Sequence, residues 1–189
     1  MIRATQGHTL QNVDAASFLE PITLADESKI PDTVVHGTFH GAWPMILRSG
    51  GLRTMGRHHV HFATGPSLES VLAAQDETSQ GKEGAKPESQ VISGMRRDAQ
   101  VLIYLDIRKA LAAGCPFWRS ENGVILSEGV PVSYGKTDTE GTPEKVVSVD
   151  FFDIVVERKL GLGKLWERGE VVKELPEHVA KKATPKNRR

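Results

Sequence analysis

Histidine, glycine and hydroxyl side chains combine in two short stretches of this chain. His36 stands in Val-His-Gly-Thr, where Gly37 and Thr38 follow it, and His61 ends the run His-His-Val-His. Neutral imidazole offers one hydrogen-bond donor and one acceptor, which suits ribose hydroxyl groups, and Thr38 adds another hydroxyl. Glycine allows the rings of a ligand to approach the backbone closely. These residues predict a nucleoside pocket, although hydrogen-bonded core histidines are the ordinary alternative.

A metal site is the second interpretation of the histidine run. On a strand His59 and His61 project to the same side, so both imidazoles could bind zinc. The chain has one cysteine, and no carboxylate lies at short ligand spacing from this pair. A complete tetrahedral ligand set is therefore not visible, and we expect no metal.

Arginine marks possible phosphate contacts. Arg96 and Arg97 follow Ser-Gly-Met just before an apolar run, and Arg57 leads into the histidine run. A guanidinium held at a strand entrance can bind phosphate through two parallel hydrogen bonds, which lysine cannot do. The alternative is a surface pair that only aids solubility. Neither a Walker loop nor G-x-G-x-x-G is present, so a nucleotide site here would be of another type.

Other candidate nucleophiles and stacking groups are weaker. No serine stands in a G-x-S-x-G elbow, and Cys115 has no neighbouring base. Trp43, Phe117 and Trp118 have apolar neighbours or lie next to a turn, so we expect them in the core rather than stacked on bases.

The elements that must position these residues are short. Apolar and β-branched runs predict strands, Pro44 and Gly114 mark helix ends, and polar composition predicts a mobile insertion at 64–90 and a loop at 134–145. A short helix at 68–74 within the insertion is possible, and the tail beyond 174 carries mostly basic charge. We expect an α+β domain with strands at 34–39, 60–63, 100–107, 124–126 and 146–156, and helices at 42–48 and 108–113.

Composition limits the partners and the compartment. The 24 basic and 24 acidic residues among 189 cancel, so only a local patch could hold a nucleic acid. A lone cysteine cannot form an intramolecular disulfide, and no long apolar run or signal sequence is visible. We expect an intracellular protein, cytoplasmic or nuclear, that is a monomer and does not bind membranes.

Five stretches, in order, resemble the RNA 2′-phosphotransferases of tRNA splicing, the KptA family. The order makes the resemblance far more specific than any one motif would be. The stretches are Ile-Arg-Ala-Thr-Gln-Gly-His-Thr at 2–9, His-Gly-Thr-Phe at 36–39, Gly-Leu-Arg-Thr-Met-Gly-Arg-His-His-Val-His-Phe-Ala at 51–63, Ile-Ser-Gly-Met-Arg at 92–96 and Asn-Gly-Val-Ile-Leu at 122–126.

The resemblance implies an NAD-binding lobe with a compact, split sheet of the ADP-ribosyltransferase type, short helices and long polar insertions. In it His36 and His61 match the first two signature histidines. The third signature position, a glutamate in many protein ADP-ribosyltransferases, is matched by Val124 or Ile125. Without that carboxylate, the acceptor would have to be anionic already, such as an RNA 2′-phosphate.

The implied reaction transfers the splice-junction 2′-phosphate of tRNA to NAD, giving ADP-ribose 1″,2″-cyclic phosphate, nicotinamide and 2′-OH RNA. Arg96, in the Gly-Met-Arg motif, would neutralise the phosphate charge, with His8 and Arg57 as further catalytic members. NAD would be bound by His36, Gly37, Thr38, His61 and Val124.

The resemblance also implies a division of the chain. We expect an NAD-binding lobe at 1–172 and a basic, disordered tail at 173–189. The family's N-terminal winged-helix-like lobe, with Leu-Arg-His and Lys-x-Arg-Phe segments, has no counterpart before Ile2. Two alternatives therefore stay beside the enzyme hypothesis: a lobe that binds NAD or ADP-ribose without turnover, and a mono-ADP-ribosyltransferase that acts on phosphorylated nucleic acid ends.

Overall fold

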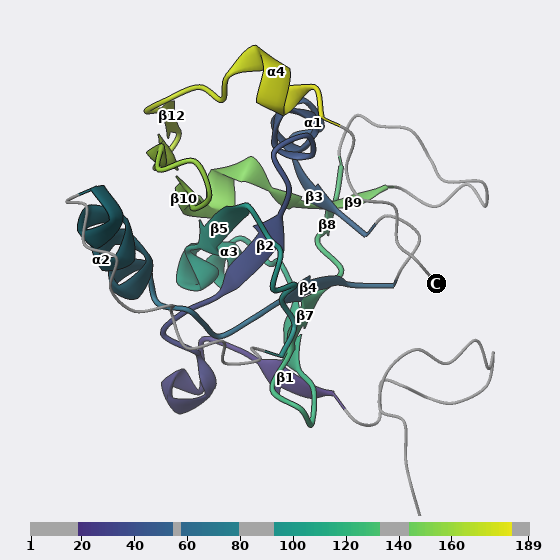
Figure 1. Ribbon diagram of the computed structural model, residues 1–189. Helices are drawn as coiled ribbons and strands as arrows, with labels where there is room; N and C mark the ends of the chain where they lie inside the picture. The colour runs from purple at the N-terminus through teal and green to yellow at the C-terminus, as the bar shows by residue number, and fades with distance from the viewer. Residues whose placement is uncertain (1–18, 55–57, 80–92, 133–143, 183–189) are drawn as a thin grey trace, which may run out of the picture.

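The computed structural model describes residues 19–54, 58–79, 93–132 and 144–182, with side chains of 76–79 left aside. Three antiparallel sheets and a few short helices make up these parts (Figure 1). The predicted α+β character is confirmed at this level. No helix within the described ranges is long and apolar enough to cross a membrane.

The first two sheets contain the two histidine motifs. In spatial order the four-stranded sheet consists of β1 (Glu20–Ile22), β6 (Phe117–Arg119), β7 (Ile125–Ser127) and β4 (Val60–Phe62). The five-stranded sheet consists of β12 (Glu170–Val171), β11 (Gly163–Glu167), β10 (Phe152–Glu157), β5 (Val101–Leu105) and β2 (Val35–Thr38).

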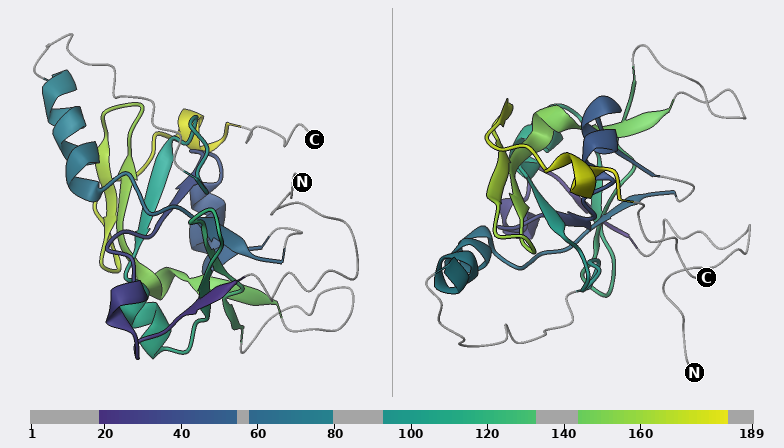
Figure 2. Two further views of the ribbon diagram at one scale, coloured as in Figure 1. Left: turned by 90° about the horizontal axis from the view of Figure 1, so that it is seen from below. Right: turned by 45° about the horizontal axis from the view of Figure 1, so that its top comes forward.

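A third sheet and the helices complete the fold, and Figure 2 shows them from two more sides. The third sheet consists of β3 (Gly51–Arg53), β9 (Lys145–Ser148) and β8 (Val130–Pro131). The helices are η2 (Glu27–Lys29), α1 (Trp43–Arg48), α2 (Leu68–Ser79), α3 (Ile107–Ala112), η3 (Val149–Phe151) and α4 (Glu177–Ala180).

Strand β5 forms the centre of the molecule. Its five residues Val-Leu-Ile-Tyr-Leu are all buried, between β2 and β10. Alternate side chains enter two different cores: Val101, Ile103 and Leu105 face the larger cluster, whereas Leu102 and Tyr104 face the smaller one. The expectation of a strand covered on both faces is confirmed.

The predicted short helices are present with the expected end signals. Pro44 lies in the first turn of α1, where its missing N–H costs nothing, and Gly50 with φ 77° follows the helix. Helix α3 begins after Asp106, whose side chain accepts a hydrogen bond from the backbone N–H of Lys109 at 2.9 Å.

Two stretches differ from the expectation. Within the proposed mobile insertion, α2 is a regular helix that packs Leu68, Val71 and Leu72 against the smaller core cluster. Within the proposed disordered tail, α4 buries Val179, which is 3% exposed. The short helix considered at 68–74 is thus present and extends to Ser79, whereas α4 contains too few apolar residues for periodicity to reveal it. Residues 80–92, 133–143 and 183–189 lie outside the described ranges.

Two of the three aromatic residues expected in the core are buried there. Trp43 and Phe117 are 5% and 1% exposed. Trp118 is only half-buried, and its ring meets that of His59 edge-on at a centroid distance of 5.5 Å.

Candidate nucleotide and phosphate site

Strands β2 and β4 belong to different sheets but meet at one point. Backbone hydrogen bonds run both ways between Val35 and Ala63, at 3.0 and 2.8 Å. This bridge brings the His-Gly-Thr strand beside the histidine run, so His36 and His61 come together as the sequence predicts.

The side chain of His36 is held by the backbone of β4. Its Nδ1 lies 2.9 Å from the carbonyl oxygen of His61. Because a carbonyl only accepts, Nδ1 carries the proton and donates, and a neutral ring keeps Nε2 as an acceptor. Burial lowers the pKa of His36, against a smaller opposing effect of this hydrogen bond, so the ring is neutral near pH 7. An edge-on contact with Phe62, at 5.8 Å between centroids, fixes the ring plane further.

Two glycines allow the turn that carries Arg96 to pack against these strands. A Cβ on Gly37 would lie 2.6 Å from Met95 Cγ and 2.9 Å from Ala99 Cβ. A Cβ on Gly94, where φ is 89°, would lie 2.6 Å from the carbonyl oxygen of Phe62. Met95 therefore packs on β2 while Gly94 packs on β4, and the turn sits where the two strands meet.

Arg96 lies at the outer side of this turn. Its side chain is exposed, and its guanidinium carbon lies 5.6 Å above the ring centroid of Phe39, within the range of a cation–π contact. Within the described ranges no acidic group is paired with it. The guanidinium is thus oriented by an aromatic face while its hydrogen-bond donors remain available to an anion.

The predicted cofactor contacts differ in their surroundings. The space beside Gly37 is filled by Met95 and Ala99, so this glycine admits the Arg96 turn, a role that the sequence did not suggest. Val124 is 1% exposed and packs toward Gly94, beneath the same turn. Thr38 is 6% exposed, and its carbonyl accepts a hydrogen bond from the N–H of Gln100 at 2.8 Å. Direct contact of these three with a cofactor stays a prediction.

The described residues give little support to a metal site or to a reactive cysteine. Within these ranges no group of three or more histidine, cysteine, aspartate or glutamate side chains is arranged to hold a metal ion. His59 lies 3.8 Å from Glu128, which also pairs with Lys145. Burial raises the pKa of the Cys115 thiol, which is not in its reactive thiolate form near pH 7.

Two predicted catalytic residues, His8 and Arg57, lie outside the described residues. Their roles therefore stay predictions. The expected polar loop at 134–145 also lies outside, apart from its last two residues, of which Lys145 begins β9.

The sequence interpretation did not single out three residues near the site: Phe39, His40 and Glu157. His40 ends the motif His-Gly-Thr-Phe-His, and its side chain and that of Glu157 are 4% and 0% exposed. One signal was available for Glu157, since a charge at the end of the apolar run Phe-Phe-Asp-Ile-Val-Val is expensive to bury without a partner. Its partner lies 117 residues away, a separation that local pattern cannot bridge.

A model of the RNA 2′-phosphotransferase family, Tpt1 / KptA, matches residues 1–129. The chain belongs to this family. The matched range contains β2, β4, the Arg96 turn and Val124, the parts of the fold that meet at the junction of the two strands.

Three curated relatives resemble the chain over about the same range. It is 40% identical to human tRNA 2′-phosphotransferase 1 over 129 residues, covering 68% of this chain and 42% of the human protein. Identity to the Danio rerio tRNA 2′-phosphotransferase 1 is 38% over 128 residues, covering 68% of this chain and 47% of the relative. For the Saccharomyces cerevisiae tRNA 2′-phosphotransferase it is 34% over 133 residues, covering 69% and 49%.

The chain thus spans less than half the length of these three relatives. Its residues beyond 129, which include β9 to β12 and α4, lie outside the family match.

Proposed function

We propose that this chain carries the NAD-binding lobe of an RNA 2′-phosphotransferase, with an ADP-ribosyltransferase-like arrangement of its sheets. Its substrates are NAD and an RNA with an internal 2′-phosphate, as at the splice junction of tRNA. The observation that carries the proposal is the packing of the Arg96 turn at the junction of β2 and β4, the strand pair that also holds the neutral His36 ring.

The residues fit the two substrates in different ways. The Nε2 atom of His36 accepts a hydrogen bond from a ribose hydroxyl of NAD, because its Nδ1 proton is already donated to His61. Thr38 and His61 help to orient NAD. Arg96 neutralises the charge of the RNA 2′-phosphate as it reacts, with donors that no described acidic side chain occupies.

The reaction has two steps. An oxygen of the 2′-phosphate attacks the ribose carbon that bears nicotinamide; the carbon–nitrogen bond breaks, and nicotinamide leaves with the electron pair. The adjacent ribose 2″-hydroxyl then attacks phosphorus, and the RNA 2′-oxygen leaves and takes up the proton lost by that hydroxyl. The products are ADP-ribose 1″,2″-cyclic phosphate and 2′-OH RNA.

The test is incubation of the chain with NAD and a 2′-phosphorylated oligonucleotide, with products separated by chromatography. We expect nicotinamide and cyclic phosphate in equal amounts from the wild type. Arg96→Ala should reduce turnover by about 100-fold or more, since a cation that stabilises transition-state charge is lost. Arg97→Ala is the matched control, because Arg97 is the exposed neighbouring arginine, and it should change turnover by less than about threefold.

Other results separate the alternatives. NAD binding without any product would indicate a binding lobe that does not turn over alone. A stable ADP-ribosylated RNA without cyclic phosphate would indicate a mono-ADP-ribosyltransferase. Equal activity of wild type and Arg96→Ala would contradict the role given to Arg96.

A further inference from the structure

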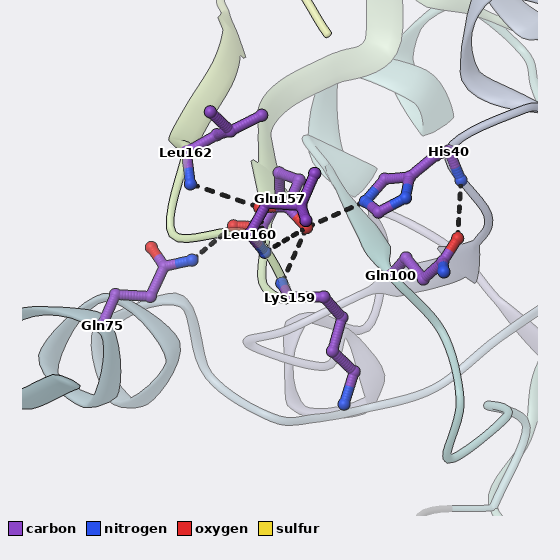
Figure 3. A network of polar contacts seen from close by, with 7 residues as sticks. All are labelled: His40, Gln75, Gln100, Glu157, Lys159, Leu160 and Leu162. Carbon is purple, nitrogen blue, oxygen red and sulfur yellow. Dashed lines mark hydrogen bonds and ion pairs between the residues drawn. The ribbon is translucent and has the colours of Figure 1, made fainter. Parts of the chain in front are cut away.

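A buried network of polar groups lies just beyond the site end of β2 (Figure 3). His40 Nε2 and Glu157 Oε1 are 2.9 Å apart, and both side chains are nearly inaccessible to solvent. His40 lies two residues after the end of β2, whereas Glu157 is the last residue of β10, on the other side of β5. The pair therefore connects two strands that are not neighbours in their sheet.

The carboxylate of Glu157 is saturated with donors. Oε1 accepts from the backbone N–H of Lys159 at 2.7 Å and of Leu160 at 3.0 Å, and Oε2 accepts from Leu160 at 2.8 Å and Leu162 at 3.2 Å. Burial by itself would raise the pKa of Glu157, but the bonds from His40 and these N–H groups outweigh it and lower the pKa. Because the ionised carboxylate only accepts, His40 Nε2 carries a proton and donates to it.

Gln100 links this network to the Arg96 turn. The backbone N–H of His40 donates to Gln100 Oε1 at 3.0 Å, while the backbone N–H of Gln100 donates to the carbonyl of Thr38 at 2.8 Å. Immediately before Gln100, Ala99 donates its N–H to the carbonyl of Arg96 at 3.2 Å. Hydrogen bonds thus join Glu157, His40 and Gln100, and the peptide bond from Gln100 to Ala99 leads on to the backbone of Arg96.

A buried ionised group is a poor way to gain stability alone, since apolar residues of similar volume often serve as well or better. The Glu157–His40 pair does fix geometry, because the carboxylate is held at once by the imidazole and by several backbone N–H groups. The Glu157 side chain also binds the backbone N–H groups that follow β10, and the backbone carbonyl of Glu157 accepts a hydrogen bond from the Gln75 side chain of α2. Several elements therefore depend on where this one carboxylate lies.

We propose that Glu157, acting through His40 and Gln100, is a positioning residue that sets Arg96 at the correct place relative to His36. The inference rests on the proposed function, and it gives a role to a residue beyond the family-matched range 1–129. Neither Glu157 nor His40 touches the reacting atoms in this scheme. Their effect is on where the guanidinium lies when the phosphate reacts.

The decisive variants change the donor of His40. His40→Phe keeps a ring but removes the hydrogen bond to Glu157, whereas His40→Gln keeps a nitrogen donor on a chain of similar reach. Gln100→Met breaks the next bond of the path and leaves the His40–Glu157 pair intact, so it serves if His40→Phe does not fold. Leu165→Ala is the stability control, since Leu165 is fully buried in β11 and lies outside the network.

Two readouts are compared for these full-length chains well below their melting temperatures. In the turnover assay we expect kcat to fall about 10- to 100-fold in His40→Phe and Gln100→Met, with KM for NAD changed less than about threefold. His40→Gln should recover most of the loss, and Leu165→Ala should keep its kcat. In NMR spectra the amide signals of Thr38 and Phe39 and the Arg96 side-chain Nε–H should shift in His40→Phe and not in Leu165→Ala.

Each outcome separates the inference from the proposed function. A wild type without turnover overturns the proposed function, and with it the positioning role in that reaction, whatever the variants do. An active wild type with His40→Phe at full kcat, or with unchanged Arg96 signals, overturns the inference and leaves the proposed function standing. A kcat loss in Leu165→Ala equal to that in His40→Phe also overturns it, because stability alone would then explain the effect.

Discussion

Two histidines four positions apart, His36 and His40, have contrasting surroundings. His36 is half-buried and donates to a neutral backbone carbonyl, and burial lowers its pKa. His40 is 3% exposed and donates to an ionised carboxylate. The carbonyl partner of His36 leaves a neutral ring whose Nε2 can still accept a hydrogen bond. The carboxylate partner of His40 holds that ring in a buried hydrogen-bond network.

The difference shows how one short segment can serve a ligand and the fold at once. A ligand-binding histidine needs an atom that the fold does not use, so its structural partner must take the donor only. A positioning histidine needs a strong and directional partner, for which a carboxylate is better suited than a carbonyl. We expect substitutions at the two positions to separate ligand binding from stability and geometry.

The largest expected effect is the loss of stability in Glu157→Ala. Removal of the carboxylate leaves His40 and the N–H groups of Lys159, Leu160 and Leu162 without their acceptor. Each buried donor that loses its acceptor costs about 1–3 kcal/mol, so the free energy of unfolding in urea should fall by about 3 kcal/mol or more. Glu170→Ala on the exposed edge strand β12 is the control, with a loss of less than about 0.5 kcal/mol. Similar losses in the two variants would mean that the network contributes little.

The next effect is expected for Gly37→Ala, which tests the site side of the comparison. The added Cβ would overlap with Met95 and Ala99, so the Arg96 turn must move away from β2. We expect turnover to fall about 10- to 100-fold and unfolding free energy to fall by about 1–3 kcal/mol. In Gly65→Ala no atom lies within 4 Å of the new Cβ, and that variant should behave like the wild type. Full activity in Gly37→Ala would show that the turn does not need its present position.

The stability contributions of His36 and of Glu157, the partner of His40, should be lost in different pH ranges. His36 has a lowered pKa in the folded state, so its stability contribution starts to be lost below about pH 6.5, the ordinary histidine value, as the unfolded chain takes up protons. Protonation of the folded state, at still lower pH, removes the Nε2 acceptor and weakens NAD binding. Glu157 has a lowered pKa, so its contribution is present above about pH 4.3 and is lost only as pH falls from there through the folded pKa.

Calorimetric titration with NAD between pH 7.5 and pH 5 checks the site half of this prediction. In His36→Asn the amide can still donate to the His61 carbonyl, but it neither titrates nor offers the Nε2 acceptor. We expect weaker NAD binding in this variant, with a flatter pH profile. An affinity of His36→Asn equal to that of the wild type at pH 7.5 would contradict the role given to Nε2.

The sequence was sufficient where the signal is local. The apolar run of β5 predicts a strand covered on both faces, and the His-Gly-Thr and His-His-Val-His motifs predict two strands whose histidines lie together. These predictions succeed because period, turn residues and chain order are properties of a few neighbouring residues. The match of the Arg96 motif to the family also depends on such a local string.

The sequence was insufficient where two distant segments decide the role of a residue. Gly37 admits Met95, which follows the polar insertion in the sequence, and no local pattern connects these two residues. Helix α2 has only a few apolar residues for its buried side, so the pattern indicated a short helix at 68–74 but not its extension to Ser79 or its packing on the core. His40 and Glu157 form a pair that only the antiparallel order β2, β5, β10 brings together.

The smallest expected effect concerns Phe39, which lies between the two histidines. Its ring supports the Arg96 guanidinium, and an exposed cation–π contact contributes about 0.5–1 kcal/mol. Phe39→Leu keeps an apolar side chain but removes the aromatic face, so kcat/KM should fall only about two- to fivefold. Because the contact acts through the guanidinium, Phe39→Leu should have no further effect in an Arg96→Ala background, as measured by a double-mutant cycle. Independent effects of the two changes would instead show that Phe39 acts through β2 and the His40 network. The cycle thus tests whether Phe39 acts through the Arg96 guanidinium.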